Sequence, residues 1–159
     1  MQLDKTTIKK LPNPKDLLKK NLNLNEINPI KILQINIRPS FTSNIDRTSR
    51  SIHLFKVDGN QFYSVVLFDN YDDYIIYNPD ASINETLNEL YKLQVPIFTN
   101  KLSRVLDGAF FDLIIFSNTN GDTISLSWYA NGPDEWSAIR TLKDALLSKI
   151  ATNLIYDEK

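Results

Sequence analysis

The chain has 159 residues, of which 42% are hydrophobic and 23% charged, and its formal net charge is −1 at pH 7. This balance excludes an intrinsically disordered chain, and the length suits one domain with its own core. The chain contains no cysteine, which excludes disulfides, a thiolate nucleophile, zinc fingers and iron–sulfur clusters. We expect a cytoplasmic protein, because this fits a reducing compartment and the sequence shows neither a secretory signal nor an apolar run of membrane-spanning length.

The beginning of the chain differs from the rest. Three prolines interrupt it, and a stretch at 15–21 that contains Leu17 and Leu18 favours one short helix able to dock on the body of the protein. We expect residues 1–29 to form an extended arm with this short helix. Residues 30–159 are expected to form a single α+β domain.

Four β-rich segments follow the arm. Alternation of apolar and polar residues predicts a strand at 30–37. The segments 51–57 and 61–68 are joined by Asp-Gly-Asn, which predicts a hairpin because glycine tolerates the positive φ that such turns require. A fourth strand is expected at 71–78, where a following proline ends it because proline donates no ladder hydrogen bond.

The next segments predict a helix and a second hairpin. A capping box at 82–85, followed by apolar residues at helical spacing, predicts a helix at 82–93. The segment beyond it is ambiguous, and a short helix at 101–106 is one interpretation. Nearly continuous apolar residues at 110–117 predict a central strand with both faces covered, and 123–130 alternates as its hairpin partner.

A final helix is expected from Pro133 onward. Proline fits the first helical position, and the two acids that follow complement the positive end of the helix dipole. Its apolar stripe consists of Trp136, Ile139, Leu142, Leu146 and Ile150. Taken together, the elements predict an α+β fold in which an antiparallel sheet of about six strands, with two hairpins, packs against two main helices.

The candidate for catalytic chemistry is the single histidine, His53, which lies close in sequence to Arg47 and Arg50. A phosphate-type site would use the histidine as general base and the arginines to stabilise charge. The more usual case is a structural histidine in a strand beside a solvated basic loop. Phosphate loops, dinucleotide fingerprints, nucleophile elbows and paired histidines are all missing from the sequence, so we expect no cofactor.

Charge is distributed unevenly along the chain. Residues 1–31 contain seven lysines and three acids, whereas residues 58–89 contain seven acids and neither lysine nor arginine. Three of these acids, Asp69, Asp72 and Asp73, lie close together, but their spacing fits no calcium loop because the turn glycine and the distal glutamate are missing. We therefore expect no metal site.

The acidic stretch is also rich in tyrosine, whose side chain offers a large contact area with a polar tip. Such a surface suits docking to a basic protein, and the expected contact residues are Asp69, Tyr71, Asp72, Asp73 and Tyr74. In broad character the chain is similar to the small cytoplasmic immunity proteins with which bacteria neutralise nuclease toxins. The competing interpretation is that the acids only keep the strands soluble and block edge pairing, with the tyrosines at the edge of the core.

Two functional hypotheses follow. The first is a non-enzymatic protein-binding module, of the immunity or antitoxin kind, that covers a basic partner such as a nuclease toxin. The alternative is a small enzyme or ligand-binding protein with a phosphate-type site at Arg47, Arg50 and His53. Membrane binding is not expected because the lysine-rich beginning lacks a broad apolar face, and nucleic-acid binding is disfavoured because the basic cluster lacks aromatic residues placed for base stacking.

Overall fold

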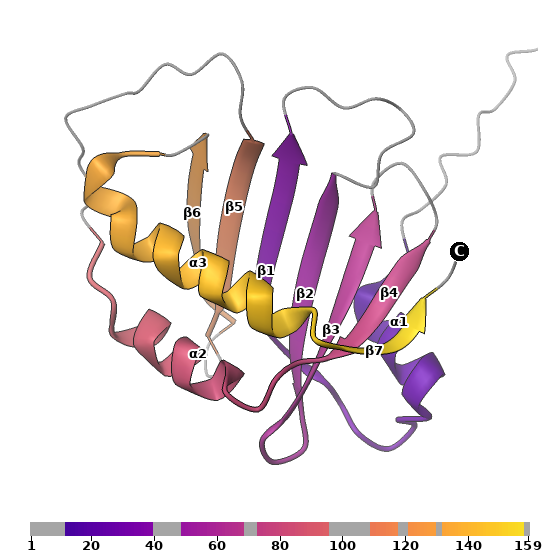
Figure 1. Ribbon diagram of the computed structural model, residues 1–159. Coiled ribbons are helices and arrows are strands. Elements are labelled where there is room, and N and C mark those ends of the chain that lie inside the picture. Colours follow the sequence, from indigo (N-terminus) through magenta and orange to yellow (C-terminus); the bar gives the residue numbers. More distant parts are fainter. Residues whose placement is uncertain are drawn as a thin grey trace, which may run out of the picture.

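The computed structural model describes residues 12–39, 49–68, 73–95, 109–117, 121–129 and 132–157. These residues form three α-helices, one 3₁₀ helix and seven strands (Figure 1). Their order along the chain is α1 (Pro14–Leu22), β1 (Ile30–Pro39), β2 (Arg50–Val57), β3 (Gln61–Phe68), β4 (Tyr74–Asn78), α2 (Ile83–Lys92), β5 (Ala109–Phe116), β6 (Thr123–Tyr129), η1 (Asp134–Trp136), α3 (Ser137–Ile150) and β7 (Asn153–Asp157).

The strands form one sheet in the order β6-β5-β1-β2-β3-β4-β7, and every neighbouring pair is antiparallel. The expected α+β class with an antiparallel sheet is confirmed. The sheet has seven strands rather than six, because the chain turns back after α3 and adds β7 beside β4. A five-residue segment at the end of a helix shows too little alternation to be predicted as a strand.

The helices lie on both faces of the sheet (Figure 1). α2 and α3 share one face, where Leu87 and Leu90 of α2 and Leu146 of α3 belong to a large apolar core with residues of β1, β2 and β3. α1 lies on the other face, where Leu18 is completely buried against Phe55 and its neighbours in a second, smaller core. The predicted short helix therefore docks on the sheet.

The β2–β3 hairpin confirms the turn prediction. Val57 is opposite Gln61, and Gly59 adopts a φ of +63°, the left-handed region that favours glycine. The apolar stripe of the last helix is confirmed in part: Ile139, Leu146 and Ile150 are buried, whereas Trp136 and Leu142 are half-buried. The expected helix start is a short 3₁₀ segment, η1, before α3 begins.

Two local predictions are wrong. β5 is not covered on both faces: it is the second strand from the sheet edge, and Phe110 on the face opposite α2 and α3 is 50% exposed. The capping box at α2 does not form, because Ser82 donates from its backbone N and its Oγ to Asp80 Oδ1, at 2.8 and 2.5 Å. Hydrogen bonds to the side chain of Asp80, two residues earlier, thus replace the bond that the Ser82 side chain would make to the first turn of the helix. The possible helix at 101–106 lies outside the described residues.

Candidate partner-binding surface

Three strands meet at the end of the sheet from which the predicted contact residues extend. Arg50, at the start of β2, is opposite Phe68, at the end of β3, and Leu67 is opposite Tyr74, at the start of β4. The connection between Phe68 and Asp73 therefore leaves and re-enters the sheet at this end. We call residues 69–73 the acidic segment; Asp69, Tyr71 and Asp72 within it lie outside the described residues.

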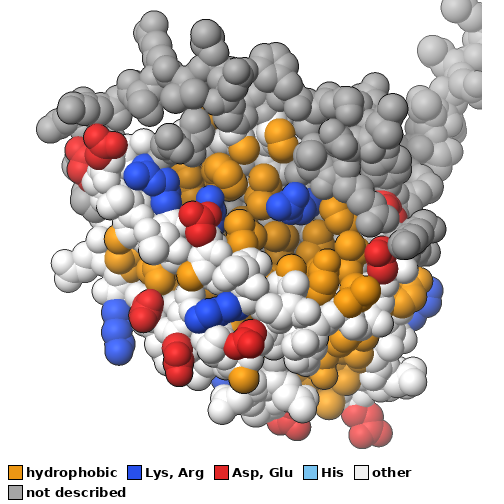
Figure 2. Space-filling model, in the orientation of Figure 1, with side chains coloured by type: hydrophobic (Ala, Val, Ile, Leu, Met, Phe, Trp, Pro, Cys, Tyr) orange, Lys and Arg blue, Asp and Glu red, His pale blue; other side chains and the backbone are white. Residues whose placement is uncertain are grey.

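A hollow of about 240 Å³ opens at the same end, on the face that carries α3. Its lining is mainly aliphatic and aromatic and comes from β2, β3, β4, α3 and the residue after α3: Arg50, Ile52, Val66, Phe68, Ile75, Tyr77, Leu147, Ile150 and Ala151. Figure 2 shows a broad group of hydrophobic atoms at the surface beside α3. We call this feature the β2–β4 hollow.

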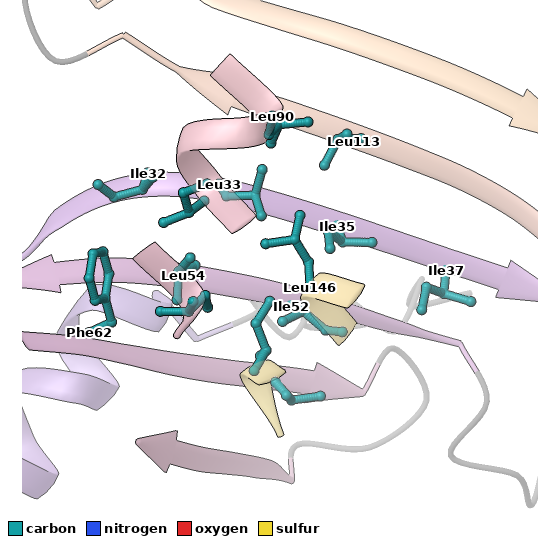
Figure 3. Close-up of a cluster of buried hydrophobic side chains, with 14 of the residues drawn as sticks. Ile32, Leu33, Ile35, Ile37, Ile52, Leu54, Phe62, Leu90, Leu113 and Leu146 are labelled. Carbon is teal, nitrogen blue, oxygen red and sulfur yellow. The ribbon is translucent and has the colours of Figure 1, made fainter. Parts of the chain in front are cut away.

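The floor of the β2–β4 hollow is continuous with the main core. Ile52 belongs to the same apolar cluster as Leu146 of α3, and Figure 3 shows these two side chains close together between helix and sheet. The floor residues Ile52, Val66 and Phe68 are more than nine-tenths buried, so they are held rigidly by packing. The accessible part of the lining consists of Ala151, which is exposed, and of Arg50, Tyr77 and Leu147, which are half-buried.

The acidic stretch is divided between the two ends of the sheet. Asp58 lies in the β2–β3 turn, and Asn78 Nδ2 donates to Phe62 O at 3.5 Å, so Asp80 and the start of α2 are at the same end as this turn. β3 has eight residues and runs from that end to the acidic segment. At about 3.3 Å per residue, the strand separates the two groups of acids by roughly 23 Å. Of the described acids, Asp73 directly precedes β4, and Asp80 N donates to Lys149 O at 3.0 Å, next to the lining residues Ile150 and Ala151.

Of the predicted contact residues, the structure describes Asp73 and Tyr74. Asp73 is half-buried, but Tyr74 is only 4% exposed and lies in the core under α1. Its ring stacks on that of Tyr156 at 5.1 Å between centroids, and its hydroxyl accepts a hydrogen bond from Asn21 Nδ2 at 2.9 Å. Tyr74 therefore ties α1 to the sheet and presents little surface to a partner.

A network of polar side chains lies on the opposite face of β1 and β5. Gln34 Oε1 accepts from Lys31 Nζ at 2.6 Å, and Gln34 Nε2 donates to Asn36 Oδ1 at 2.9 Å. Asp112 Oδ2 accepts from Arg38 Nη2 at 2.9 Å, an ion pair at the rim of the network, and from Asn36 Nδ2 at 3.4 Å. This group was not predicted from the sequence, although Gln34 and Asn36 alternate with apolar residues in one strand. The network bounds a second hollow, of about 250 Å³, lined by Gln34, Asn36, Arg38, Arg50 and Ser51.

His53 lies on this face, between the polar network and the α1 core. It is 6% exposed, and its Nε2 is 2.9 Å from Ser51 Oγ. Burial, assisted by the charge of Lys31, lowers the pKa of His53 to about 3. The imidazole is therefore neutral and a weak base at pH 7. Arg50 is three residues away in the same strand, so its Cβ is on the other face, but Arg50 also lines the second hollow next to Ser51. Arg47 lies outside the described residues.

The described residues contain no group of three or more histidine, aspartate or glutamate side chains placed to hold a metal ion. None of the described helices is long and apolar enough to cross a lipid bilayer. No protein-family model, curated protein or solved structure matches the chain.

Proposed function

We propose that the protein is a non-enzymatic binding module that covers a basic protein partner, as an immunity protein covers its toxin. The observation that carries this proposal is the β2–β4 hollow, whose lining residue Phe68 immediately precedes the acidic segment in the chain. An apolar centre with a charged rim is the usual anatomy of a protein–protein interface. The apolar floor would receive an anchoring side chain of the partner, and the acids would attract its basic surface.

Protein partners suit this surface better than small ligands do. The β2–β4 hollow is about 240 Å³, below the usual range of roughly 300–1,000 Å³ for small-molecule pockets. Half-buried Tyr77 beside a rigid floor offers the kind of contact that gives hot spots in interfaces, where tyrosine is enriched. Three carboxylates in the acidic segment would raise the association rate with a basic partner and make it sensitive to salt.

The enzyme alternative receives weaker support from the described residues. His53 is neutral and buried, and it pairs with Ser51 rather than with an arginine. Asp112, the carboxylate nearest to the polar network, is already engaged by Arg38 and Asn36. A general base for phosphoryl transfer needs an accessible group with a pKa near the working pH, which the described part of this face does not provide.

The test begins with capture of partners from a lysate of the source organism by the tagged protein, followed by measurement of the affinity with both proteins purified. The informative variant is Asp72→Lys with Asp73→Lys, and the matched control is Glu85→Lys with Glu89→Lys, which makes the same charge change on exposed residues of α2. We expect the first variant to weaken binding at least about tenfold and the control to stay within about threefold, because charges act mainly within a Debye length of the interface.

A third variant tests the hollow itself. Leu147→Glu places a charge at its half-buried rim and should weaken binding at least about tenfold, while circular dichroism checks that the fold is retained. If the partner is a nuclease, one equivalent of wild-type protein should abolish its activity, and the Asp72/Asp73 variant should need an excess. Equal affinity of wild type and both informative variants, or a partner with no basic surface, would contradict the proposal.

A further inference from the structure

Among the residues that the structure describes, β6 is an edge strand without the usual protection against pairing. Within the described part of the chain it has a neighbour, β5, on one side only, and the pairing runs in continuous register from Thr123 to Tyr129. The seven residues of β6 include no charged residue and no proline. Natural edge strands are commonly protected by charges, proline, bulges or short length. The other edge, β7, has such features: it is five residues long, carries Asp157 and pairs irregularly with β4.

The side chains of β6 are accessible to another molecule. Ile124 is 62% exposed, and Thr123, Ser125 and Ser127 are also exposed. Ile124 belongs to the lining of a largely apolar hollow of about 300 Å³ that also includes Tyr91 of α2. A β-branched residue exposed to this extent at a sheet edge is stabilised when a further strand covers it.

We propose that β6 pairs antiparallel with β6 of a second copy of this chain, around a two-fold axis at Leu126. The two sheets would then continue into one another. In this register each cross-strand pair joins side chains of like polarity: Leu126 with Leu126, Ile124 with Trp128, Ser125 with Ser127, and Thr123 with Tyr129.

The symmetry of the strand favours a second copy over a foreign strand. A two-fold interface must be complementary to itself, so that if one residue contacts another, the reverse contact also occurs. β6 meets this condition because apolar and hydroxyl side chains alternate symmetrically about Leu126 and no like charges meet. A foreign partner would normally be selected by complementary charge, which β6 lacks.

This dimer is independent of the proposed partner-binding function. β5 and β1 lie between β6 and the strands of the β2–β4 hollow, so pairing through β6 leaves that hollow accessible in each copy. Each dimer would therefore present two partner-binding surfaces at its outer parts. Loss of dimerisation should leave the affinity of one copy for a partner unchanged.

The test is sedimentation equilibrium of the full chain at about 1–200 µM, the range in which modest interfaces are populated. Ser125→Lys with Ser127→Lys places lysine opposite lysine twice in the proposed register. Ser125→Lys with Ser127→Glu places lysine opposite glutamate twice and is the matched control. Since each cross-strand charge pair contributes roughly 0.2–1 kcal/mol, we expect the first variant to dissociate about tenfold or more readily than the second. Leu154→Lys on β7 should leave dimerisation unchanged.

Cross-linking tests the register directly, because the chain has no native cysteine. Residues directly opposite in an antiparallel pair have Cα atoms about 4.5–5.5 Å apart, within disulfide range. A mixture of the Ser125→Cys and Ser127→Cys variants should therefore form a disulfide-linked heterodimer more readily than either variant alone forms a homodimer. A monomeric wild type at 200 µM, equal dissociation of the two charge variants, or equal cross-linking of mixed and separate variants would overturn the proposal.

Discussion

Removal of most of the Leu18 side chain tests whether α1 is part of the folded domain. Leu18 is 0% exposed and packs in the second core with Phe55, Val65 and Ile76. Leu18→Ala deletes three carbon atoms, worth about 2.4 kcal/mol at roughly 0.8 kcal/mol for each buried methylene. A cavity adds to this cost, and measured buried Leu→Ala changes span about 2.7–5 kcal/mol. We expect the free energy of unfolding to fall by about 3 kcal/mol.

The assay is equilibrium unfolding in urea, followed by far-ultraviolet circular dichroism and by tryptophan fluorescence. Trp128 and Trp136 lie on the face opposite α1, so coincident transitions would show that the two cores unfold together. Leu17→Ala is the matched control, because it makes the same change of helix propensity at a half-buried position. If Leu18→Ala lowers the free energy of unfolding by less than about 1 kcal/mol, or by no more than Leu17→Ala does, the docking of α1 does not contribute to stability as reasoned here.

Further predictions concern pH and two glycines. The pKa of His53 is about 3 in the folded protein, below its value of 6.5 in the unfolded chain. On acidification the unfolded chain therefore takes up a proton first, and the stability of the fold decreases as the pH drops from 6.5 toward 3. In urea titrations the free energy of unfolding should fall by up to about 1.4 kcal/mol for each pH unit of acidification, and by less in the His53→Gln variant. The same dependence on pH in the two proteins would contradict the burial of a neutral His53. Gly59→Ala should cost about 1–2 kcal/mol, since Gly59 has a φ of +63° but open space around it. Gly132→Ala should lower the thermal midpoint more than Gly59→Ala does, because its new Cβ would also lie 3.1 Å from Trp128 Cδ1.

Interactions close in sequence were the most predictable part of the fold. The Asp-Gly turn between β2 and β3 needs only the conformational freedom of Gly59, and the stripe on α3 needs only a helical period that ends at buried Ile150. β3 coincides with its predicted range, 61–68. The fold class can be predicted from such local patterns, because each pattern indicates whether a segment is a helix or a strand and which of its faces is buried.

The candidate site depends on which strands and helices become neighbours, and the periodicity of the sequence does not specify this. The acids at 58–89 appear continuous in the sequence, but reversal of direction at each hairpin sends Asp58 and Asp73 to opposite ends of the sheet. Tyr74 has the composition of a contact residue, yet its burial follows from the docking of α1, which lies more than fifty residues earlier. The β2–β4 hollow could not be predicted, since its lining combines three strands with α3.

The sequence by itself determined the α+β class, the position of most elements and the uneven distribution of charge. Tertiary structure alone decided the strand order, the burial of His53 and Tyr74, the addition of β7 and the exposure of β6 as an edge. The physical reason is that secondary structure responds to periods of two and about 3.6 residues within a segment. Burial, pKa and accessibility instead depend on which segments become neighbours, and that is set by packing across the whole sheet.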